Sequence, residues 1–381
     1  MPILGYKECK IKKMKVAILG ARGIPARYGG YDTLIEELVR GFEASDNIQV
    51  LVYCRSNYYK NKPASLHGAR LVYIPAPRLK SLESLLHTFL SSLHVLVQNI
   101  DLIYLVDPGN APFCLLLSLC GKHVIVHTDG IGWKRRKWGP LSRRYYKFAE
   151  WICARTANIL ITDNPEMQKY YQKEYSADSV YIAYGASVNA STNHTVYKEC
   201  GLSEKGYLLV VARLEPENNT ELIIKEFTQS KVNLPLVIVG DSPYSRIYMH
   251  RLQELADKRV RFLGRIYDQS KLNALYKGAY LYIHGHEVGG TNPSLLRAMN
   301  AGSTPVVIDV PFNKVVIGKS GFVFKRNSGY LSSLLECLVN NHTEVMDKGY
   351  MAQKRANTLF KWEFVVEEHK KLFCRLYGKV I

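Results

Sequence analysis

Residues 14–38 read MKVAILGARGIPARYGGYDTLIEEL, and this stretch decides the class of fold. The opening MKVAIL is an apolar, β-favouring run typical of a buried strand, and TLIEEL spaces its apolar residues as a helix does. The turn between them is rich in glycine, which permits a sharp bend and lets backbone N–H groups approach a ligand closely. A strand that passes through such a turn into a helix is typical of parallel α/β sheets.

The same alternation continues along the chain. In the first half, the further apolar runs are IQVLVYC, ARLVYIP, IDLIYLV, KHVIVHT, ANILITD and SVYIAYG. Beyond the polar residues 187–203, the pattern restarts with YLLVVAR, LPLVIVG, RVRFLG, AYLYIHG, STPVVID and SGFVF. Strands that alternate with helices predict parallel sheets covered on both faces. We therefore expect an α/β fold of two doubly wound Rossmann-like domains that face each other across a cleft.

These patterns predict the domain organisation. We expect a basic extension over 1–13, a first domain over 14–190, a linker over 191–203, a second domain over 204–343 and C-terminal helices over 344–381. In open parallel sheets, ligands bind beyond the carboxyl ends of the strands. The glycine-rich turns and the cleft between the domains are therefore where function is expected.

The composition is that of a globular protein of the cytoplasm. The 381 residues are 47% hydrophobic, which is enough for two cores. No uninterrupted apolar run approaches the ~18 residues of a spanning helix. The N-terminus resembles a secretory signal superficially, but its apolar part runs into the glycine turn and fits a first strand better. Eight cysteines stand singly without a CxxC pair, which indicates reduced thiols in the cytosol.

The formal charge of +18 is densest in residues 133–151, WKRRKWGPLSRRYYKFAEW. Basic residues interleaved with aromatic ones favour peripheral contact with an anionic membrane surface, here the inner face of the plasma membrane. A solvated basic face is the alternative. Nucleic acid is not expected as a partner, because no nucleic-acid-binding motif accompanies the charge.

The first glycine turn is a candidate anion site. Gly29 and Gly30 let backbone N–H groups approach a ligand, and Arg22 and Arg27 add cations. The turn has neither the GxGxxG spacing of dinucleotide-binding proteins nor the GK[ST] of a P-loop. Its pattern therefore favours an anion site of another kind over an oxidoreductase or a nucleoside triphosphatase.

Residues 284–302, HGHEVGGTNPSLLRAMNAG, form a second candidate anion site. Gly289 and Gly290 follow a predicted strand and open the loop, Asn292 is a good N-cap, and Pro293 is a good first helical residue. The helix that follows points its positive end at the cleft, which suits a diphosphate. An ordinary capped helix would explain Asn292 and Pro293 but not the glycine pair.

Polar side chains also follow predicted strands. Arg213 can bind phosphate bidentately, and its alternative is a surface salt bridge with Glu215 or Glu217. His127 and Asp129 can bind a sugar hydroxyl or handle a proton of an acceptor, whereas a purely structural histidine is the alternative for His127. No DxD, HExxH or dense cluster of histidines and carboxylates occurs, so no metal and no other cofactor is expected.

Four motifs carry a resemblance to a known family: GARGIPARYGGYDT, DGIGWKRRKW, ARLEPENN and HEVGGTNPSLLRAM. From Met14 onward the chain resembles family 4 glycosyltransferases. Within them it is similar to the rhamnosyltransferase-like branch, whose N-terminal domain of unknown function is typical of capsule and O-antigen enzymes. The resemblance implies a retaining enzyme of the GT-B fold, whose last helix crosses back to the first domain.

The resemblance also implies residue roles. Arg213 would bind the diphosphate, and the backbone around Arg265 and Ile266 would receive the nucleobase. Contacts with the donor phosphates and sugar are implied for Gly29, Gly30, Gly289, Gly290, Thr291 and Asn292.

One position departs from the resemblance. The branch carries a glutamate in SLLEAM that accepts hydrogen bonds from the ribose, whereas this chain has Arg297, which can accept none. Glu287 is the candidate stand-in acceptor. Arg297 either contacts the nucleotide differently, weakens donor binding or marks a loss of activity.

The expected function is that of a hexosyltransferase in cell-surface glycan synthesis. It would move a hexose or deoxyhexose, rhamnose by resemblance, from a nucleoside diphosphate sugar to a lipid-linked or polysaccharide acceptor. His127, Asp129 and Arg213 are the expected catalytic residues. The alternative is a catalytically degenerate GT-B protein that acts as a sugar- or partner-binding subunit, which Arg297 favours.

Overall fold

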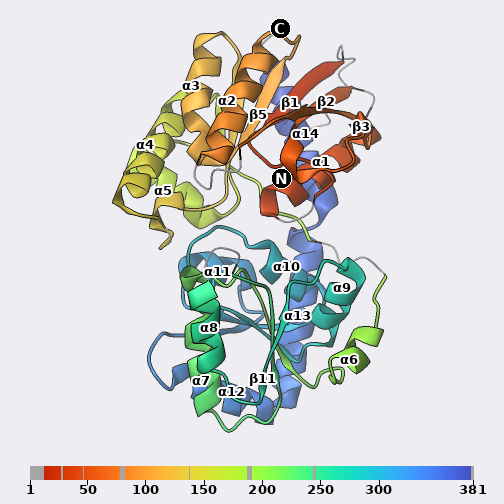
Figure 1. Ribbon diagram of the computed structural model, residues 1–381, viewed down its shortest axis with the longest axis vertical. Coiled ribbons are helices and arrows are strands. Elements are labelled where there is room, and N and C mark those ends of the chain that lie inside the picture. Colours follow the sequence, from red (N-terminus) through yellow and green to blue (C-terminus); the bar gives the residue numbers. More distant parts are fainter. Residues whose placement is uncertain are drawn as a thin grey trace, which may run out of the picture.

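The computed structural model describes residues 13–26, 29–45, 47–77, 82–136, 138–186, 191–242 and 246–378. The extension predicted over 1–13 lies outside these residues except for Lys13, as do Arg27 and Lys137. The chain forms two α/β domains, which lie one above the other in Figure 1, each built on a parallel or mostly parallel sheet. The predicted class of fold is therefore confirmed.

The first domain contains an eight-stranded sheet in the order β3-β4-β2-β1-β5-β6-β7-β8. Its strands are β1 (Met14–Leu19), β2 (Ile48–Arg55), β3 (Ser65–Leu66), β4 (Ala69–Ile74), β5 (Leu102–Val106), β6 (His123–Thr128), β7 (Ile159–Thr162) and β8 (Val180–Tyr181). All neighbours pair in parallel except the short β3, which the sequence did not predict and which is antiparallel to β4.

Helices cover both faces of this sheet. They are α1 (Gly30–Glu43), α2 (Glu83–Leu96), α3 (Ala111–Leu119), α4 (Pro140–Thr156) and α5 (Pro165–Tyr175), with short 3-10 turns η1 (Ser56–Tyr58), η2 (Pro108–Asn110) and η3 (Gly132–Lys134). Because successive strand residues point to opposite faces, Val16 and Ile18 of β1 join the core under α1, while Ala17 and Leu19 join the core under α2, α3 and α4.

The second domain contains a six-stranded parallel sheet in the order β11-β10-β9-β12-β13-β14. Its strands are β9 (Leu208–Val211), β10 (Leu236–Val239), β11 (Val260–Gly264), β12 (Leu281–His284), β13 (Thr304–Ile308) and β14 (Phe322–Phe324). Its helices are α6 (Thr195–Glu199), α7 (Thr220–Gln229), α8 (Arg246–Glu254), α9 (Gln269–Gly278), α10 (Pro293–Asn300), α11 (Pro311–Ile317), α12 (Tyr330–Asn340) and α13 (His342–Leu359), with the 3-10 turn η4 (Pro216–Asn218).

The segment 191–203, indicated as a linker by its sequence, includes helix α6. The Tyr197 hydroxyl of α6 donates to the Ala274 carbonyl of α9 over 2.7 Å, so this part of the segment packs on the second domain. Its apolar residue Val196 is buried there.

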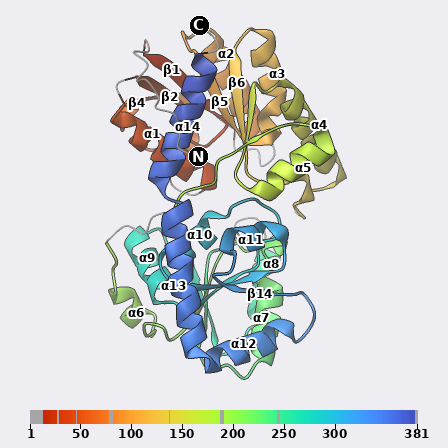
Figure 2. The same cartoon turned by 180° about the vertical axis from the view of Figure 1, so that it is seen from behind.

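The chain returns to the first domain at its C-terminal end. Helix α13 lies along the second domain, and α14 (Trp362–Tyr377) packs against α1 of the first domain, as Figure 2 shows. The rings of Phe42 and Phe373 lie 5.8 Å apart between α1 and α14. Gly41 allows this approach, since a Cβ there would lie 2.5 Å from Val366. None of the described helices is long and apolar enough to cross a membrane.

Candidate functional site

Two helix N-termini meet where the domains face each other. Helix α1 of the first domain begins at Gly30, and helix α10 of the second begins at Pro293. A Cβ on Gly30 would lie 3.6 Å from Cγ of Pro293 and 3.7 Å from the Tyr184 hydroxyl. Each helix end carries a partial positive charge. The N-cap Gly29 of α1 makes no side-chain capping bond, whereas at α10 Pro293 has no N–H and the Ser294 N–H is bonded to Asn292. The N–H groups of α1 and the positive end of α10 together suit a phosphate-bearing anion.

The loop before α10 fits closely against the first domain. The N–H of Gly290 donates to the Asp129 carbonyl over 3.0 Å, and a Cβ on Gly130 would lie 2.7 Å from Cα of Gly289. The N–H of Thr291 donates to Oδ2 of Asp163 over 2.9 Å. Side chains on Gly130 or Gly290 would therefore hold the domains apart.

Two residues fix the ends of this loop. The Thr291 hydroxyl donates to the carbonyl of Asp163. Asn292 caps α10, since its side chain accepts from the Ser294 N–H over 3.0 Å. A Cβ on Gly290 would overlap the carboxyl of Asp163, so the paired glycine has a steric reason that a capped helix alone does not give.

His127 is the penultimate residue of β6 and is fully buried. Its Nδ1 is hydrogen-bonded to the Tyr104 hydroxyl, which also lies 3.0 Å from Nε2 of His369 on α14. Its Nε2 is buried and has no hydrogen-bond partner among the described residues. Burial lowers the pKa of His127 well below its ordinary value, so the ring is neutral. A purely structural role for His127 therefore explains the hydrogen bond at Nδ1 but not the buried Nε2 without a partner.

Two tyrosines border His127. The ring of Tyr31, from α1, meets it edge-on with centroids 5.9 Å apart, and the ring of Tyr184 lies 5.7 Å away. The Tyr184 hydroxyl is buried and, within the described part of the chain, makes no hydrogen bond. Buried polar groups normally have partners, so a ligand that bonds both this hydroxyl and Nε2 of His127 is expected.

A pair of acidic residues ends adjacent strands of the first sheet. Asp129 follows β6, and Asp107 follows β5 with a φ of 71°, a left-handed conformation that is costly for a residue other than glycine. Burial and then the charge of Asp129 raise the pKa of Asp107. Although burial acts to lower the pKa of Arg135, the surrounding negative charges, Asp129 foremost, raise it above its ordinary value. Sequence analysis placed Arg135 in the basic surface, whereas the structure places it at the site.

Arg213 approaches the same region from the second domain. It follows β9, and its Nη1 lies 3.9 Å from Oε1 of Glu215, which is a long ion pair. Burial and then the positive charge of Arg213 lower the pKa of His286 to about 3. Nδ1 of His286 is buried, and none of the residues that the structure describes bonds it.

The side chains assigned to the nucleotide make their contacts within the second domain. Nη2 of Arg297 donates to Oε1 of Gln269 over 3.0 Å and to Oδ1 of Asn273 over 2.7 Å, both on α9. Nη2 of Arg265 donates to Asp241 over 2.7 Å, and Ile266 packs against the core. The side-chain amides of Gln269 and Asn273 on α9 thus hold Arg297. A glutamate at position 297 would face the same two amides.

Glu287 is engaged in ion pairs. Its carboxylate lies 3.3 Å from Nη2 of Arg136 in the first domain and also contacts Arg326. The candidate stand-in acceptor therefore joins the two domains.

Sequence analysis missed Tyr31, Tyr104, Asp107, Asp163, Tyr184 and His369 as residues of this region. Asp107 and Asp163 each follow a predicted strand, as Asp129 does, and that position was the available signal. No such signal marks Tyr184 and His369, because Tyr184 lies in the interdomain crossing and His369 lies in the last helix.

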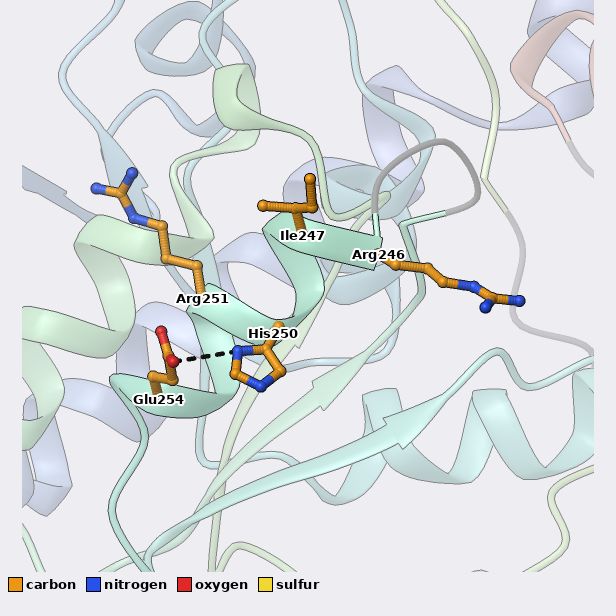
Figure 3. A pocket seen from close by; sticks show the side chains of 5 residues that line it. All are labelled: Arg246, Ile247, His250, Arg251 and Glu254. Atoms are coloured by element: carbon orange, nitrogen blue, oxygen red, sulfur yellow. Dashed lines mark ion pairs between the residues drawn. The ribbon is translucent and has the colours of Figure 1, made fainter.

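Two hollows lie away from this region. One, of about 540 Å³, is an open surface along α8, and Figure 3 shows Ile247 and Arg251 beside the 3.1 Å ion pair of His250 with Glu254. The other, of about 260 Å³, lies at the domain junction beside Tyr181 and Arg355. In the described ranges, no group of three or more His, Cys, Asp or Glu residues could hold a metal ion.

Two family models match the chain. Residues 13–187 match the domain of unknown function DUF1972, and residues 198–354 match the glycosyl transferases group 1 family. A search among curated proteins gave no significant match.

Solved structures share the fold. Sucrose-phosphate synthase from Thermosynechococcus elongatus is similar with a TM-score of 0.82 and 16% identity, over 96% of this chain and 100% of that one. Anabaena HepE in complex with UDP-glucose is similar with a TM-score of 0.75 and 16% identity, over 95% and 100%. The starch synthase IV catalytic domain from Arabidopsis thaliana, bound to ADP and acarbose, has a TM-score of 0.73 and 14% identity, over 96% and 100%.

The fold is therefore GT-B, with two Rossmann-like domains facing each other. The match of the second domain to group 1 glycosyl transferases, together with the helix N-termini at the interface, makes the protein a glycosyltransferase similar to those of family 4.

Proposed function

We propose that the protein transfers a hexose or deoxyhexose from a nucleoside diphosphate sugar to a lipid-linked or polysaccharide acceptor, with retention of the anomeric configuration. Rhamnose is the sugar that the resemblance of the four motifs favours. The single observation that carries the proposal is the meeting of the α1 and α10 N-termini, where a Cβ built on Gly30 would lie 3.6 Å from Cγ of Pro293.

Helix N-termini and an arginine side chain would stabilise the leaving diphosphate. The N–H groups at the start of α1, the positive end of the α10 dipole and the guanidinium of Arg213 supply positive charge where negative charge develops. Such fixed donors need no reorganisation during the reaction, so the site can act without a metal ion. Arg135, on the acceptor side, would hold the carboxylates of Asp107 and Asp129 in place.

The sugar would lie against Tyr184 and His127. The Tyr184 hydroxyl and Nε2 of His127 are among the buried polar atoms without a partner in the described residues, and both lie beside the α1 N-terminus. The acceptor hydroxyl would attack from the leaving-group face, and Asp129 would orient it from the end of β6. Attack from that face retains the configuration.

The outer face of α2, α3 and α4 supports an acceptor at a membrane. These helices pack side by side (Figure 1) and expose apolar side chains, among them Val97 at 79%, Leu119 at 78% and Leu141 at 81%. On α4, Phe148 and Trp151 stack with centroids 6.1 Å apart, and basic residues are exposed around them: Arg143, Arg144, Lys147 and Arg155. An apolar surface bordered by cations suits an anionic bilayer.

Membrane contact is tested with vesicles. Wild-type protein should sediment with vesicles of phosphatidylcholine and phosphatidylglycerol but not with phosphatidylcholine alone. Leu141→Asp should abolish sedimentation. Ile247→Asp is the matched control, because Ile247 is equally exposed, at 85%, and stands beside Arg251 on α8 of the other domain (Figure 3). Equal loss in both variants would contradict a specific membrane face.

The transferase reaction is tested with a panel of nucleoside diphosphate sugars, without added metal. Hydrolysis or transfer from one of them above background, with the product's anomeric configuration determined by NMR, would support a retaining enzyme and identify the donor. Nucleotide binding without turnover would instead support a binding subunit, which the contacts of Arg297 with Gln269 and Asn273 favour.

A further inference from the structure

Three side chains from distant parts of the sequence form one buried chain of hydrogen bonds. His127 lies on β6, Tyr104 lies on β5 and His369 lies on α14, and each is at most 1% exposed. Nδ1 of His369 lies 2.7 Å from the Val365 carbonyl, and its Nε2 lies 3.0 Å from the Tyr104 hydroxyl, which in turn contacts Nδ1 of His127. The rings of the two histidines are parallel within 9° at 6.1 Å.

The donor and the acceptor of each hydrogen bond follow from the Val365 carbonyl at one end of the chain of bonds, because a carbonyl can only accept. Nδ1 of His369 therefore carries a proton. The ring is neutral, because burial lowers the pKa of His369 to about 4, and its Nε2 is therefore an acceptor. Tyr104 has one hydroxyl proton, which it donates to that Nε2. Its oxygen can then only accept from His127, so Nδ1 of His127 carries the proton and Nε2 does not.

We infer that His369 is a positioning residue that fixes the tautomer of His127, so that Nε2 of His127 accepts a hydrogen bond from a sugar hydroxyl. The alternative tautomer would present an N–H, which suits a phosphate oxygen. The helix that crosses back from the second domain thereby sets the kind of ligand atom that the end of β6 can bind. This inference rests on the proposed function for the identity of the hydroxyl, but not for the tautomer.

The tautomer is measured directly by long-range ¹H–¹⁵N NMR of histidine-labelled protein. Signals of the 11 histidines are assigned by comparison with His127→Ala and His369→Gln variants. In wild-type protein, His127 should show a protonated Nδ1 and an unprotonated Nε2. In His369→Phe, which retains the ring volume, Tyr104 loses its acceptor and should donate to His127, whose proton should move to Nε2.

Transferase activity provides a second test of the inference. His369→Phe should lower kcat roughly tenfold or more, with KM for the nucleotide sugar changed by less than about threefold, because the lost hydrogen bond contacts the sugar and not the diphosphate. His369→Gln retains an acceptor for Tyr104 and should keep both the tautomer and kcat close to wild type. Adding His369→Phe to Tyr104→Phe should cause no further loss, since Tyr104 carries the hydrogen bonds that connect the two histidines in the described part of the chain.

Three results would overturn the inference: a protonated Nε2 on His127 in wild-type protein, an unchanged tautomer in His369→Phe, or additive losses in the double variant. Thermal unfolding of each variant checks that it folds, and Tyr104→Phe replaces His369→Phe if the latter does not. If the protein shows the expected tautomers but no transferase activity, this inference holds and the proposed function is wrong.

Discussion

The two domains contribute to the site in different ways. The second domain supplies a loop, a capped helix end and Arg213, all within motifs that are continuous in the sequence. The first domain supplies one helix end at Gly30 and a group of buried side chains gathered from β5, β6, the interdomain crossing and α14. The second domain thus resembles a preformed anion site, and the first a shaped pocket for hydroxyl groups.

The difference teaches where binding energy and specificity reside. The positive end of a helix and an arginine attract any phosphate, so the second domain's half should set affinity for the diphosphate. The buried hydroxyl of Tyr184 and Nε2 of His127 are costly to leave without a partner, so the first domain's half should reject sugars that lack a matching group.

The largest effect is expected from Gly290→Ala. The new Cβ would overlap the carboxyl of Asp163 and push the loop away from the first domain. Transferase activity should fall by roughly 100-fold or more, because a misplaced site loses its geometry. Steady-state kinetics and circular dichroism check this prediction. Gly139→Ala is the control: nothing lies within 4 Å of a Cβ at Gly139, and activity there should be unchanged.

Arg213→Ala should weaken nucleoside diphosphate binding by roughly 10- to 100-fold, the effect of losing a charge-assisted contact. Calorimetry measures this change, and Arg213→Lys should recover only part of it because lysine cannot bind bidentately. Since the ion pair with the buried Glu215 is long and Arg213 is partly exposed, the melting temperature should stay within about 2 °C of wild type. A variant that binds normally would remove Arg213 from the site.

The two domains differ in how much of the site could be predicted from the sequence alone. The strands, the parallel sheets and the capped loop before α10 follow from local patterns, since each depends on neighbours in sequence. Tyr184 and His369 could not be predicted, because their surroundings come from elements up to 265 positions away, as for Tyr104 and His369. The short β3 was missed because its two residues carry too little pattern.

A milder effect is expected from Tyr184→Phe, which separates ligand binding from folding. Removing a buried hydroxyl that has no partner in the described residues should leave stability unchanged or slightly raised, while kcat/KM falls roughly tenfold. Tyr171→Phe is the matched control, because the Tyr171 hydroxyl is also buried without a described partner but lies in the core under α5. Equal activity in the two variants would contradict a ligand contact at Tyr184.

The smallest effect on activity is expected from Glu150→Gln, in a buried polar group of the first domain far from the helix ends. Burial raises the pKa of Glu150 to about 7, against hydrogen bonds from the hydroxyls of Tyr170 and Tyr175. The unfolded state loses its proton near pH 4.5 and the folded state near pH 7, so stability falls as pH rises between these values.

The variant should therefore gain roughly 1–3 kcal/mol of unfolding free energy relative to wild type at pH 8 compared with pH 4, with activity unchanged. Urea unfolding at the two pH values measures it. A gain independent of pH would show that folding leaves the pKa of Glu150 unchanged, which would contradict the prediction.

The most direct test of the account is calorimetric titration of the purified protein, without added metal, with UDP, dTDP and GDP and with the matching monophosphates. If the α1 and α10 N-termini together bind a diphosphate, one diphosphate should bind at least tenfold more tightly than its monophosphate. No binding of any diphosphate, or equal binding of the two forms, would contradict the central claim.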